Sequence, residues 1–579
     1  MSVHEPQAWD RPAPGSPGQV SLPSWRWLSE AMWRIEHSFG RARADARPEE
    51  DTRVRIFVIM MLFSAVFVCL ALGAVNAALL APKGGGGWVR HPNAMMRGDL
   101  VDRNGALLAT NIVHYGLYID PAEVWDRRAA AARIKRALPR VSMAKLNRVL
   151  AGERRLIVMT GLTPAEKAAV HGLALGGVTF EPEDRRVYPL GASTTHVLGA
   201  ADTGGEGISG AELAFNREIQ QAGAEGESFA LSIDLRIQGV LENELARAVA
   251  DNQAKGAVGI VHDVQTGEVL GMASWPTTDR LNRATSAHYE MGSVFKTFTV
   301  AAGLDTGRAD MDTKFDATEA FVIGNRRITD FHATHEVLTL EEVYLHSSNI
   351  GTSRLAVEMG PAVMQDYFKR FGLLDAAPIE LHESARPRRP IKWDDSTLAS
   401  LSFGYGIMIT PLQMSAAMGA LTNGGSFIPL TLRKGGRPDA EPRQVVSPET
   451  SATLLELLRL NVVRGSGGRA DAAGLRVGGK TGSANKLVNG RYDPTHAVGT
   501  FAAVFPADGP LNARRYSILI LIDEPGAYPR TGGFVAAPAV GRIADRIAPF
   551  LGVQRRADPY RTAMGEKIPV FEDVAGDGR

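Results

Sequence analysis

The longest run of apolar positions lies near the N-terminus of the chain. Residues 56–82 carry no charged side chain. At about 1.5 Å per residue, a helix of this length crosses a hydrocarbon core of about 30 Å. The run is longer than a signal-peptide core and begins deep in the chain, which favours an uncleaved transmembrane helix. The alternative is a helix buried in a soluble core.

Charged residues around this run predict its orientation. Five arginines lie between residues 41 and 55, and the basic residues after the run are fewer. This bias predicts a cytoplasmic tail over residues 1–55 and places the rest of the chain outside. In the tail, residues 1–23 are rich in Pro, Gly and Ser and are expected to be disordered. Residues 24–39 fit either an amphipathic helix on the membrane surface or an unstructured tail.

Residues 83–227 alternate short helical and strand-like segments. A glycine-rich stretch at 83–88 predicts a flexible exit from the membrane, and Asn104-Gly105 is typical of a tight turn. No set of chemically reactive residues converges here. We therefore expect an elongated pedestal domain that positions the domain after it.

The pattern changes over residues 228–552. Residues 231–234 are strand-like, and Asp234 is expected to cap a helix that runs towards Ala250. Apolar segments around Gln265-Thr266-Gly267 predict a β-hairpin. Helical patterns then dominate, and strand-like runs return before a final helix, at 479–483, 498–505, 516–522 and about 538–550. This order predicts a mixed α/β (α+β) domain, with an antiparallel sheet flanked by helices and an all-helical subdomain. Residues 553–579 are expected to form a flexible tail.

Composition narrows the possible functions. The chain has 579 residues, enough for several domains. Its 64 Lys and Arg against 63 Asp and Glu give a net charge of +1, so no basic excess points to nucleic acid. The only cysteine, Cys69, excludes a disulfide framework and a cysteine-rich zinc site. The 13 histidines form no H-E-x-x-H pair, and we expect neither a metal nor a cofactor.

Two glycine-rich matches to G-x-G-x-x-G need an explanation. Residues 205–210 do not follow a buried parallel strand, and residues 465–470 follow a helical pattern. A dinucleotide site requires a strand before the glycines and a helix after them. Both segments are therefore interpreted as loops.

Ser293 and Lys296 are the strongest candidates for chemistry. They are three apart at the predicted start of a helix, so the lysine amine can reach the serine hydroxyl. A serine needs a nearby base to become a nucleophile, and a lysine serves as one only if burial or cationic neighbours lower its pKa. Helix N-terminal N–H groups would favour a developing oxyanion.

Spacing alone does not select this pair. S-x-x-K occurs three times, at Ser142/Lys145, Ser293/Lys296 and Ser483/Lys486. Only the second match precedes an apolar helix and is followed by further candidate groups, which are Ser347, Asn349, Lys480, Thr481, Gly482 and Ser483. Taken singly, these residues are more typical of helix caps, turns, surface lysines and an edge strand. Their order within one domain favours an enzyme.

The motifs S-x-x-K, S-x-N and K-T-G in this order resemble those of the class B penicillin-binding proteins. Within that family, residues 96–550 resemble the division-specific peptidoglycan D,D-transpeptidases. The resemblance extends to segments of the pedestal and of the transpeptidase domain, at 97–105, 186–189, 196–199, 207–212, 404–406 and 410–413. Met291 stands where the family usually has proline, and Ser483 where threonine is common.

The resemblance implies a role for each candidate. Ser293 would attack the carbonyl between the two terminal D-alanines of a stem peptide, and Lys296 would take its proton. Ser347 and Lys480 would pass a proton to the leaving D-alanine. Asn349 would bind the peptide backbone, and Gly482 would let it approach closely. Thr481 and Ser483 would hold the terminal carboxylate, and the N–H groups of Ser293 and Ser483 would form the oxyanion hole.

The resemblance also implies partners and a location. The expected ligands are peptidoglycan stem peptides, both D-Ala-D-Ala donor and amine acceptor, and β-lactam antibiotics. The chain would be a single-pass inner-membrane protein with a cytoplasmic N-terminus and a periplasmic catalytic domain. A polytopic peptidoglycan glycosyltransferase and other division proteins are the expected partners, and nucleic acid is not.

Several related functions compete with this interpretation. An elongation-specific class B transpeptidase would normally have a larger pedestal than the short segment from His196 to Glu212 indicates. A β-lactamase would be smaller and would carry an E-x-x-L-N motif. A bifunctional class A enzyme would carry a glycosyltransferase domain. A penicillin-binding sensor would need more membrane spans, and a scaffold would not need all three motifs.

Overall fold

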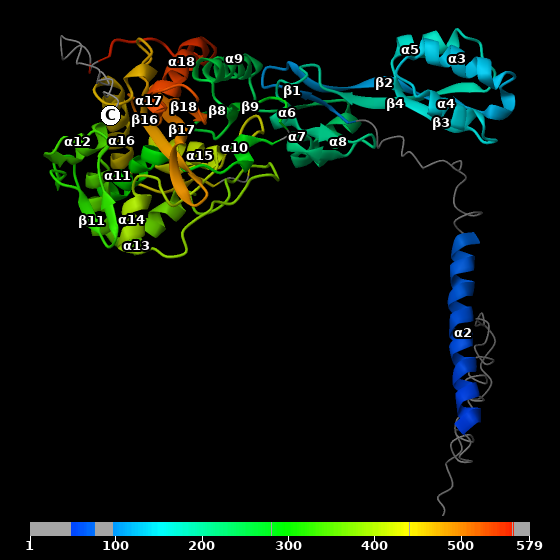
Figure 1. Cartoon of the computed structure of the whole chain (residues 1–579), viewed down its shortest axis with the longest axis horizontal. Coiled ribbons are helices and arrows are strands. Elements are labelled where there is room, and N and C mark those ends of the chain that lie inside the picture. The colour runs from blue at the N-terminus through cyan, green and yellow to red at the C-terminus, as the bar shows by residue number, and fades with distance from the viewer. Residues whose placement is uncertain (1–47, 76–96, 280, 439–440, 559, 561–579) are drawn as a thin grey trace, which may run out of the picture. The chain divides into compact units, whose positions relative to one another are not determined.

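The computed structural model describes residues 48–75, 97–279, 281–438, 441–558 and 560 of the chain (Figure 1). The chain divides into two units, Met1–Arg90 and His91–Arg579. The first unit contains helix α2 (Pro48–Val75), which includes the first part of the apolar run. Among the described residues, none of the helices combines the length and hydropathy that a membrane span requires. The predicted helix at 24–39 and residues 76–82 lie outside the described residues.

The pedestal strands belong to a five-stranded sheet in which β4 pairs with β2 beside the order β3-β2-β1-β7, and the last strand, β7, comes from the segment after residue 227. The β1–β2 connection contains the expected turn, with Gly105 at φ 88°. Helices α3, α4 and α5 pack against this sheet through a core of their own. The strands are β1 (Asp99–Val101), β2 (Leu107–Ile119), β3 (Leu156–Leu162), β4 (Val178–Val187) and β7 (Ser228–Ala230), and the helices are α3 (Arg127–Ala137), α4 (Met143–Leu150) and α5 (Pro164–His171).

The pedestal continues into short elements next to the catalytic domain. In the glycine-rich segment at 205–210, residues 207–209 form β6, which pairs antiparallel with β5, and Gly210 begins α7, so no parallel strand precedes the glycines. The loop prediction was therefore wrong for residues 207–209, which form a strand. The short elements are η2 (Pro121–Glu123), α6 (Thr195–Leu198), β5 (Ala200–Ala201), β6 (Gly207–Ser209), α7 (Gly210–Ala214) and α8 (Asn216–Glu225).

The domain predicted over residues 228–552 is organised around a five-stranded antiparallel sheet in the order β16-β17-β18-β8-β9. The expected hairpin is confirmed as β8 and β9, and β16 is an edge strand. Sequence positions 231–234 form no strand, because β7 ends at Ala230 and only Leu231 makes an isolated bridge. The strands are β8 (Gly256–Asp263), β9 (Val269–Trp275), β16 (Gly478–Val488), β17 (Arg491–Phe505) and β18 (Tyr516–Asp523).

Both faces of this sheet are buried. Alternate residues of a strand point to opposite faces, so the residues of β18 contact two different cores. In β18, Ile518, Ile520 and Ile522 contact a core that includes α9 and α18, which lie side by side in Figure 1. Leu519 and Leu521 contact the core of the helical subdomain. Asp234 caps α9 as predicted. The helices are α9 (Leu235–Asn252), α11 (Lys296–Asp305), α13 (Asn349–Arg370), α15 (Pro411–Thr422), α16 (Pro448–Val463) and α18 (Ala537–Leu551).

Smaller elements surround the candidate residues of the three motifs. They connect the sheet to the helical subdomain and supply most of the loops around those residues. These elements are α10 (Arg283–Ser286), η3 (Gly292–Phe295), β10 (Lys314–Asp316), β11 (Phe321–Ile323), β12 (Arg326–Ile328), β13 (Val337–Thr339), α12 (Leu340–Leu345), α14 (Asp395–Leu401), β14 (Ser426–Phe427), β15 (Arg443–Gln444), η4 (Gly468–Ala470) and α17 (Gly532–Val535).

Candidate active site

Three segments that are far apart in the sequence meet at one cavity of about 850 Å³. They are the η3–α11 junction, the α12–α13 turn and strand β16. The predicted residues that line the cavity are Ser293, Ser347, Asn349, Thr481 and Ser483. Lys296 and Lys480 are fully buried beneath them. All the candidates that were predicted from the three motifs are thus brought together, with Gly482 in the backbone of β16.

Ser293 lies in a tight turn that a glycine makes possible. Gly292 has φ 54°, and a Cβ there would lie 2.3 Å from the carbonyl oxygen of Ser483. The η3 turn therefore packs directly on the backbone of β16. From the other side, a Cβ on Gly482 would lie 2.2 Å from the Met291 carbonyl oxygen. The absence of side chains on these two glycines places Ser293 beside the K-T-G strand.

Ser347 lies between the two lysines. Lys296 Nζ donates to the Ser347 hydroxyl at 3.0 Å and also to its carbonyl oxygen. Lys480 Nζ donates to the same hydroxyl at 3.0 Å. Ser347 has a left-handed backbone, with φ 55°. Within the described residues no hydrogen bond joins Ser293 to Lys296, and catalytic hydrogen bonds often tighten only when substrate binds.

The environment of the two lysines lowers the pKa of both amines. Burial lowers the pKa of Lys480 to about 7. Burial, and then the positive charge of Lys480, hold the pKa of Lys296 well below its usual value of 10.5, while the Asp330 carboxylate acts in the opposite direction. A neutral lysine amine is a base, so the site can accept a proton near neutral pH.

Asp330 organises the S-x-N turn, and we did not predict it. Its carboxylate accepts hydrogen bonds from the Ser348 hydroxyl at 2.6 Å, the Asn349 N–H at 2.5 Å and the Ile350 N–H at 2.9 Å. The Asn349 side-chain amide donates to the Thr329 carbonyl at 2.9 Å. An aspartate in a loop 18 residues before Ser348 carries no sequence signal for this contact.

Two further groups hold the hydroxyls of the K-T-G strand. The Thr481 hydroxyl lies 2.8 Å from that of Ser466, and the Ser483 hydroxyl accepts from the Gly532 N–H at 3.0 Å. Ser466 belongs to the glycine-rich segment 465–470, which follows α16 as expected. This segment forms part of the cavity wall, a role that its sequence did not indicate.

An aromatic and acidic cluster joins β16 to the turn that carries Ser293. The Tyr405 hydroxyl accepts from the Asn485 N–H at 3.1 Å. Glu290 accepts from the Gly406 N–H at 2.7 Å and from the Tyr492 hydroxyl at 3.0 Å. Burial raises the Glu290 pKa, although these two hydrogen bonds oppose the shift. Tyr405 also lines the cavity.

The structure distinguishes the three S-x-x-K matches. Ser142 caps α4, where its hydroxyl accepts from the Lys145 N–H at 3.4 Å. Lys486 forms ion pairs with Asp523 at 2.5 Å and Glu524 at 2.9 Å. Of the three serine–lysine pairs, only the Lys296 pair contacts Ser347 and has Lys480 beside it.

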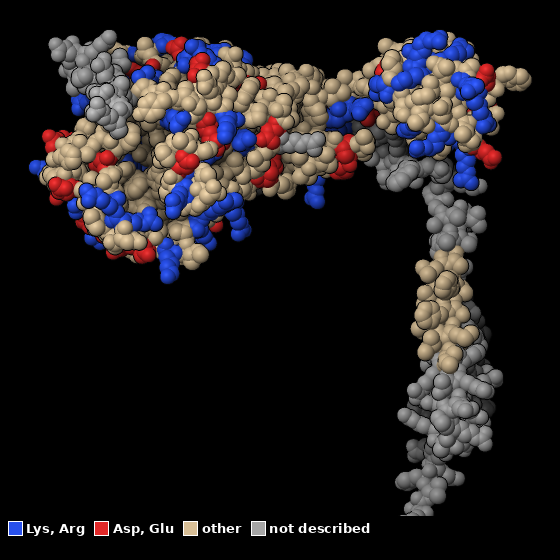
Figure 2. All heavy atoms as spheres, viewed as in Figure 1, with Lys and Arg blue, Asp and Glu red and all other residues tan. Residues whose placement is uncertain are grey.

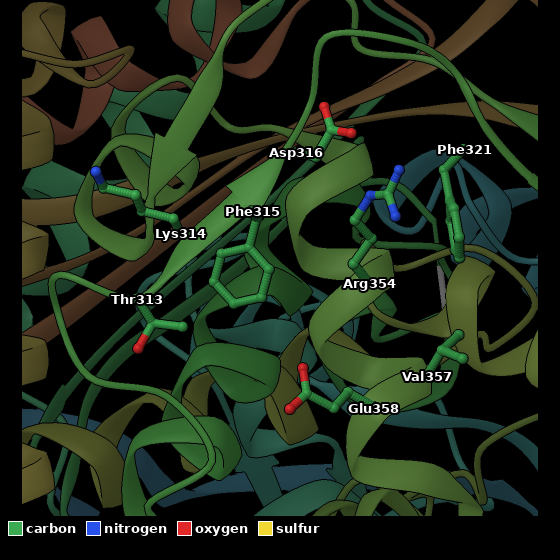
Figure 3. Close-up of a pocket in the computed structure, with 8 residues that line it drawn as sticks. All are labelled: Thr313, Lys314, Phe315, Asp316, Phe321, Arg354, Val357 and Glu358. Carbon is green, nitrogen blue, oxygen red and sulfur yellow. The ribbon is translucent and has the colours of Figure 1, made fainter.

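A second cavity, of about 410 Å³, lies between β10, β11 and α13 (Figure 3). Arg354 stacks on the Phe321 ring at 4.8 Å and is electrostatically coupled to Asp316. Lys314 and Glu358 also line this cavity. It contains none of the predicted site residues, and its charged groups are of both signs. Among the described residues, no group of three or more His, Cys, Asp or Glu side chains is arranged to hold a metal ion.

Comparison with known proteins gives two family matches. The penicillin binding protein transpeptidase domain matches residues 257–545, and the penicillin-binding protein dimerisation domain matches residues 92–220. A probable peptidoglycan D,D-transpeptidase FtsI of Caulobacter vibrioides is 51% identical over 95% of this chain and 98% of its own length.

Two other relatives are more distant. A probable peptidoglycan D,D-transpeptidase PenA of Neisseria gonorrhoeae is 30% identical over 86% of this chain and 93% of its own length. The peptidoglycan D,D-transpeptidase FtsI of Escherichia coli K12 is 30% identical over 81% of this chain and 86% of its own length.

Proposed function

Since the chain belongs to the class B penicillin-binding proteins of the FtsI type and is a division-specific peptidoglycan D,D-transpeptidase, we propose that Ser293 is its acyl-accepting nucleophile. Neutral Lys296 removes the hydroxyl proton as the oxygen attacks the carbonyl between the terminal D-alanines. The N–H groups of Ser293 and Ser483 stabilise the developing oxyanion. The contact between η3 and β16 supports this pairing of N–H groups.

The leaving D-alanine needs a proton on its nitrogen. Ser347 donates its hydroxyl proton to this amine and is reprotonated from Lys296 or Lys480, since both amines contact its oxygen. Thr481 and Ser483 bind the terminal carboxylate, and Asn349 binds the peptide backbone. An acceptor amine then attacks the acyl-enzyme through the same groups in reverse, which releases Ser293 and forms the cross-link.

The observation that carries this proposal is the Ser347 hydroxyl within 3.0 Å of both lysine amines, beside Ser293. The test is covalent labelling of the purified full-length chain by a fluorescent penicillin. We expect Ser293→Ala to abolish labelling. Ser142→Ala, in the S-x-x-K match outside the cavity, should keep it. Labelling of the Ser293 variant at the wild-type rate would overturn the assignment.

We also propose the domain boundaries and topology. The pedestal spans 83–227 and the transpeptidase domain 228–552, and the two family matches fall within these ranges. The uncharged run at 56–82 supports a single-pass anchor with a cytoplasmic N-terminus and a periplasmic catalytic domain. A reporter that is active only in the periplasm should work at the C-terminus and fail at the N-terminus, and the reverse would contradict this topology.

The proposed partners are a polytopic peptidoglycan glycosyltransferase and other division proteins. This proposal rests on the family alone, because the sequence of the anchor does not identify a partner. Co-purification from detergent extracts of dividing cells would test it, and retention of the partners by a chain without residues 1–82 would argue against contact through the anchor.

A further inference from the structure

The charged residues that line the catalytic cavity are all basic. Both basic and acidic side chains are scattered over the visible surface (Figure 2), and the whole chain has a net charge of +1. Among the described residues that line the cavity, in contrast, there is no Asp or Glu, and two arginines are present, Arg469 and Arg530. The cavity therefore favours an anionic ligand over a neutral one.

Arg530 has N–H donors that its hydrogen bonds to the protein do not use. Its guanidinium is held by three carbonyl oxygens, those of Pro525 at 3.0 Å, Pro494 at 3.3 Å and Gly526 at 3.4 Å. A guanidinium has five N–H donors, so two remain for a ligand. No carboxylate among the described residues forms an ion pair with it. The nearby acids Asp493 and Glu524 are already bonded to Thr495 and His496, and to Lys255 and Lys486, respectively.

The two arginines lie towards opposite ends of the stretch of β16 that lines the cavity. Arg469 belongs to η4, which follows Ser466, and the Ser466 hydroxyl contacts Thr481. Arg530 contacts Pro494 of β17, next to the register position where Asn485 pairs with Ala497. Thr481 and Asn485 are separated by about 13 Å, at about 3.3 Å per strand residue.

The direction in which a substrate extends follows from its chemistry, and this step rests on the proposed function. The terminal carboxylate at Thr481 is the end of the peptide, so the rest of the peptide must run the other way. At the N-terminal end of β16 the backbone is closed, because Gly479 is buried and its carbonyl accepts from Asn461 at 2.7 Å. At the other end the cavity continues past Ser483 to Asn485, Pro494 and Arg530.

We propose that Arg530 is a specificity-determining residue that binds a carboxylate of the donor stem peptide upstream of the D-Ala-D-Ala pair. The residue two positions before the terminal D-alanine lies about 7 Å along the strand, at about 3.3 Å per residue, and its side chain spans the remaining distance to Arg530. We therefore place the carboxylate on the side chain of that residue. An Arg–carboxylate pair in a partly buried cleft discriminates against the corresponding amide, because the amide leaves the guanidinium without a charged partner.

The test uses the full-length chain and two synthetic pentapeptides that end in D-Ala-D-Ala. They differ only in a carboxylate or a carboxamide on the side chain of the residue before that pair. The assay measures kcat/KM for exchange of the terminal D-alanine for a labelled D-amino acid, so the acceptor is the same in both reactions. We expect wild type to prefer the carboxylate peptide by about tenfold, the ratio that about 1.4 kcal/mol produces.

Matched variants test whether Arg530 causes the preference for the carboxylate peptide. In Arg530→Gln we expect the ratio to fall to about 1, because kcat/KM falls for the carboxylate peptide and not for the carboxamide peptide. Arg530→Lys should keep part of the preference. Arg469→Gln, at the other end of β16, and Arg308→Gln, an exposed residue outside the cavity, should keep the wild-type ratio.

The outcomes separate this inference from the proposed function. Equal rates for the two peptides in wild type, or an unchanged ratio in Arg530→Gln, would overturn the inference while labelling of Ser293 stands. If Arg530→Gln no longer binds the penicillin, the inference is tested by the ratio of the two peptides in Arg530→Lys and by the wild-type ratio at raised salt. A ratio that does not fall with increasing ionic strength would then overturn the role of this charge.

Discussion

At the scale of single residues, the proposed role of Lys296 as the base for Ser293 depends on what surrounds the lysine amine. Burial is the largest effect on the Lys296 pKa, and Lys480 adds to it. The third S-x-x-K lysine, Lys486, is instead paired with two carboxylates. The same residue types at the same spacing therefore have different chemistry, because a lysine acts as a base only where its charged form is disfavoured.

Asp330 offers a test of this electrostatic argument. Its negative charge raises the Lys296 pKa, so its removal in Asp330→Asn lowers that pKa further. In the proposed mechanism Lys296 acts only when its amine is neutral, so the acid limb of the rate of penicillin acylation against pH should move to lower pH. The lost charged acceptor of the Asn349 and Ile350 N–H groups should also cost about 1.5–3 kcal/mol of unfolding free energy.

A matched control separates the effect of the Asp330 charge on the Lys296 pKa from the general effect of losing a carboxylate in this domain. Asp316→Asn removes a carboxylate that accepts from Thr318 and lies near Arg354 in the same domain. It should leave the acid limb where it is in wild type. An acid limb that moves to higher pH in Asp330→Asn, or that moves equally in both variants, would show that Asp330 does not set the Lys296 pKa.

At the scale of elements, the site is a contact between a turn and a strand. The η3 turn and β16 approach so closely because both lack side chains at the contact, at Gly292 and Gly482. Gly404 closes on the same turn, since a Cβ there would lie 2.2 Å from the Gly292 carbonyl oxygen. These glycines let the turn that carries Ser293 pack on the backbone of Ser483.

Gly292→Ala tests the importance of that contact. The new methyl group would lie 2.3 Å from the Ser483 carbonyl oxygen, so the turn must move away from β16. A misplacement of about 1 Å at a reacting group costs about 100-fold in rate, and we expect penicillin acylation to fall by at least that factor.

The control for backbone strain is Gly307→Ala. Gly307 also has a positive φ, 64°, but a Cβ there meets nothing within 4 Å. Both variants pay about 1–2 kcal/mol for the left-handed backbone, and only Gly292→Ala should lose acylation. Equal acylation rates in the two variants would contradict the role of the η3–β16 contact.

At the scale of the whole unit, Asp102 connects the pedestal to the catalytic domain. This aspartate is buried, with 1% of its surface exposed. It accepts from the Asn104 and Ala106 N–H groups in the pedestal turn, both at 2.8 Å, and from the Leu235 N–H at 3.1 Å. Leu235 begins α9 of the catalytic domain, so one carboxylate holds both sides of the junction. Parallel pairing of β1 with β7 supports the same connection.

Asp102→Ala should therefore loosen the junction. Each lost hydrogen bond to a buried charge costs about 1.5–3 kcal/mol, and we expect a total loss of at least 3 kcal/mol of unfolding free energy with faster proteolysis near residue 228. Asp126→Ala removes an exposed cap of α3 in the pedestal and should cost about 1 kcal/mol. Thermal unfolding and limited proteolysis measure both effects, and equal losses in the two variants would contradict the junction role.

Much of this architecture could be read from the chain itself. The β8–β9 hairpin, the cap of α9 by Asp234 and the final helix follow from local patterns, because alternation and capping act over a few residues. The strand predicted at 231–234 was wrong, because pairing between strands is not local. An apolar pattern predicts an extended conformation. Whether that segment becomes a strand depends on hydrogen bonds to a partner strand that is distant in the sequence.

The sequence by itself determined the chemistry available to this protein, since Ser293, Lys296, Ser347, Asn349 and the K-T-G residues were identified from their types and order. Only the tertiary structure decided which groups act together. The contacts of Asp330, Ser466 and Gly532 with the motifs span 15 to 49 residues and carry no local pattern. The low pKa of Lys480 likewise comes from burial, which no spacing encodes. Local propensities act along the chain, whereas desolvation and packing depend on what the fold brings near.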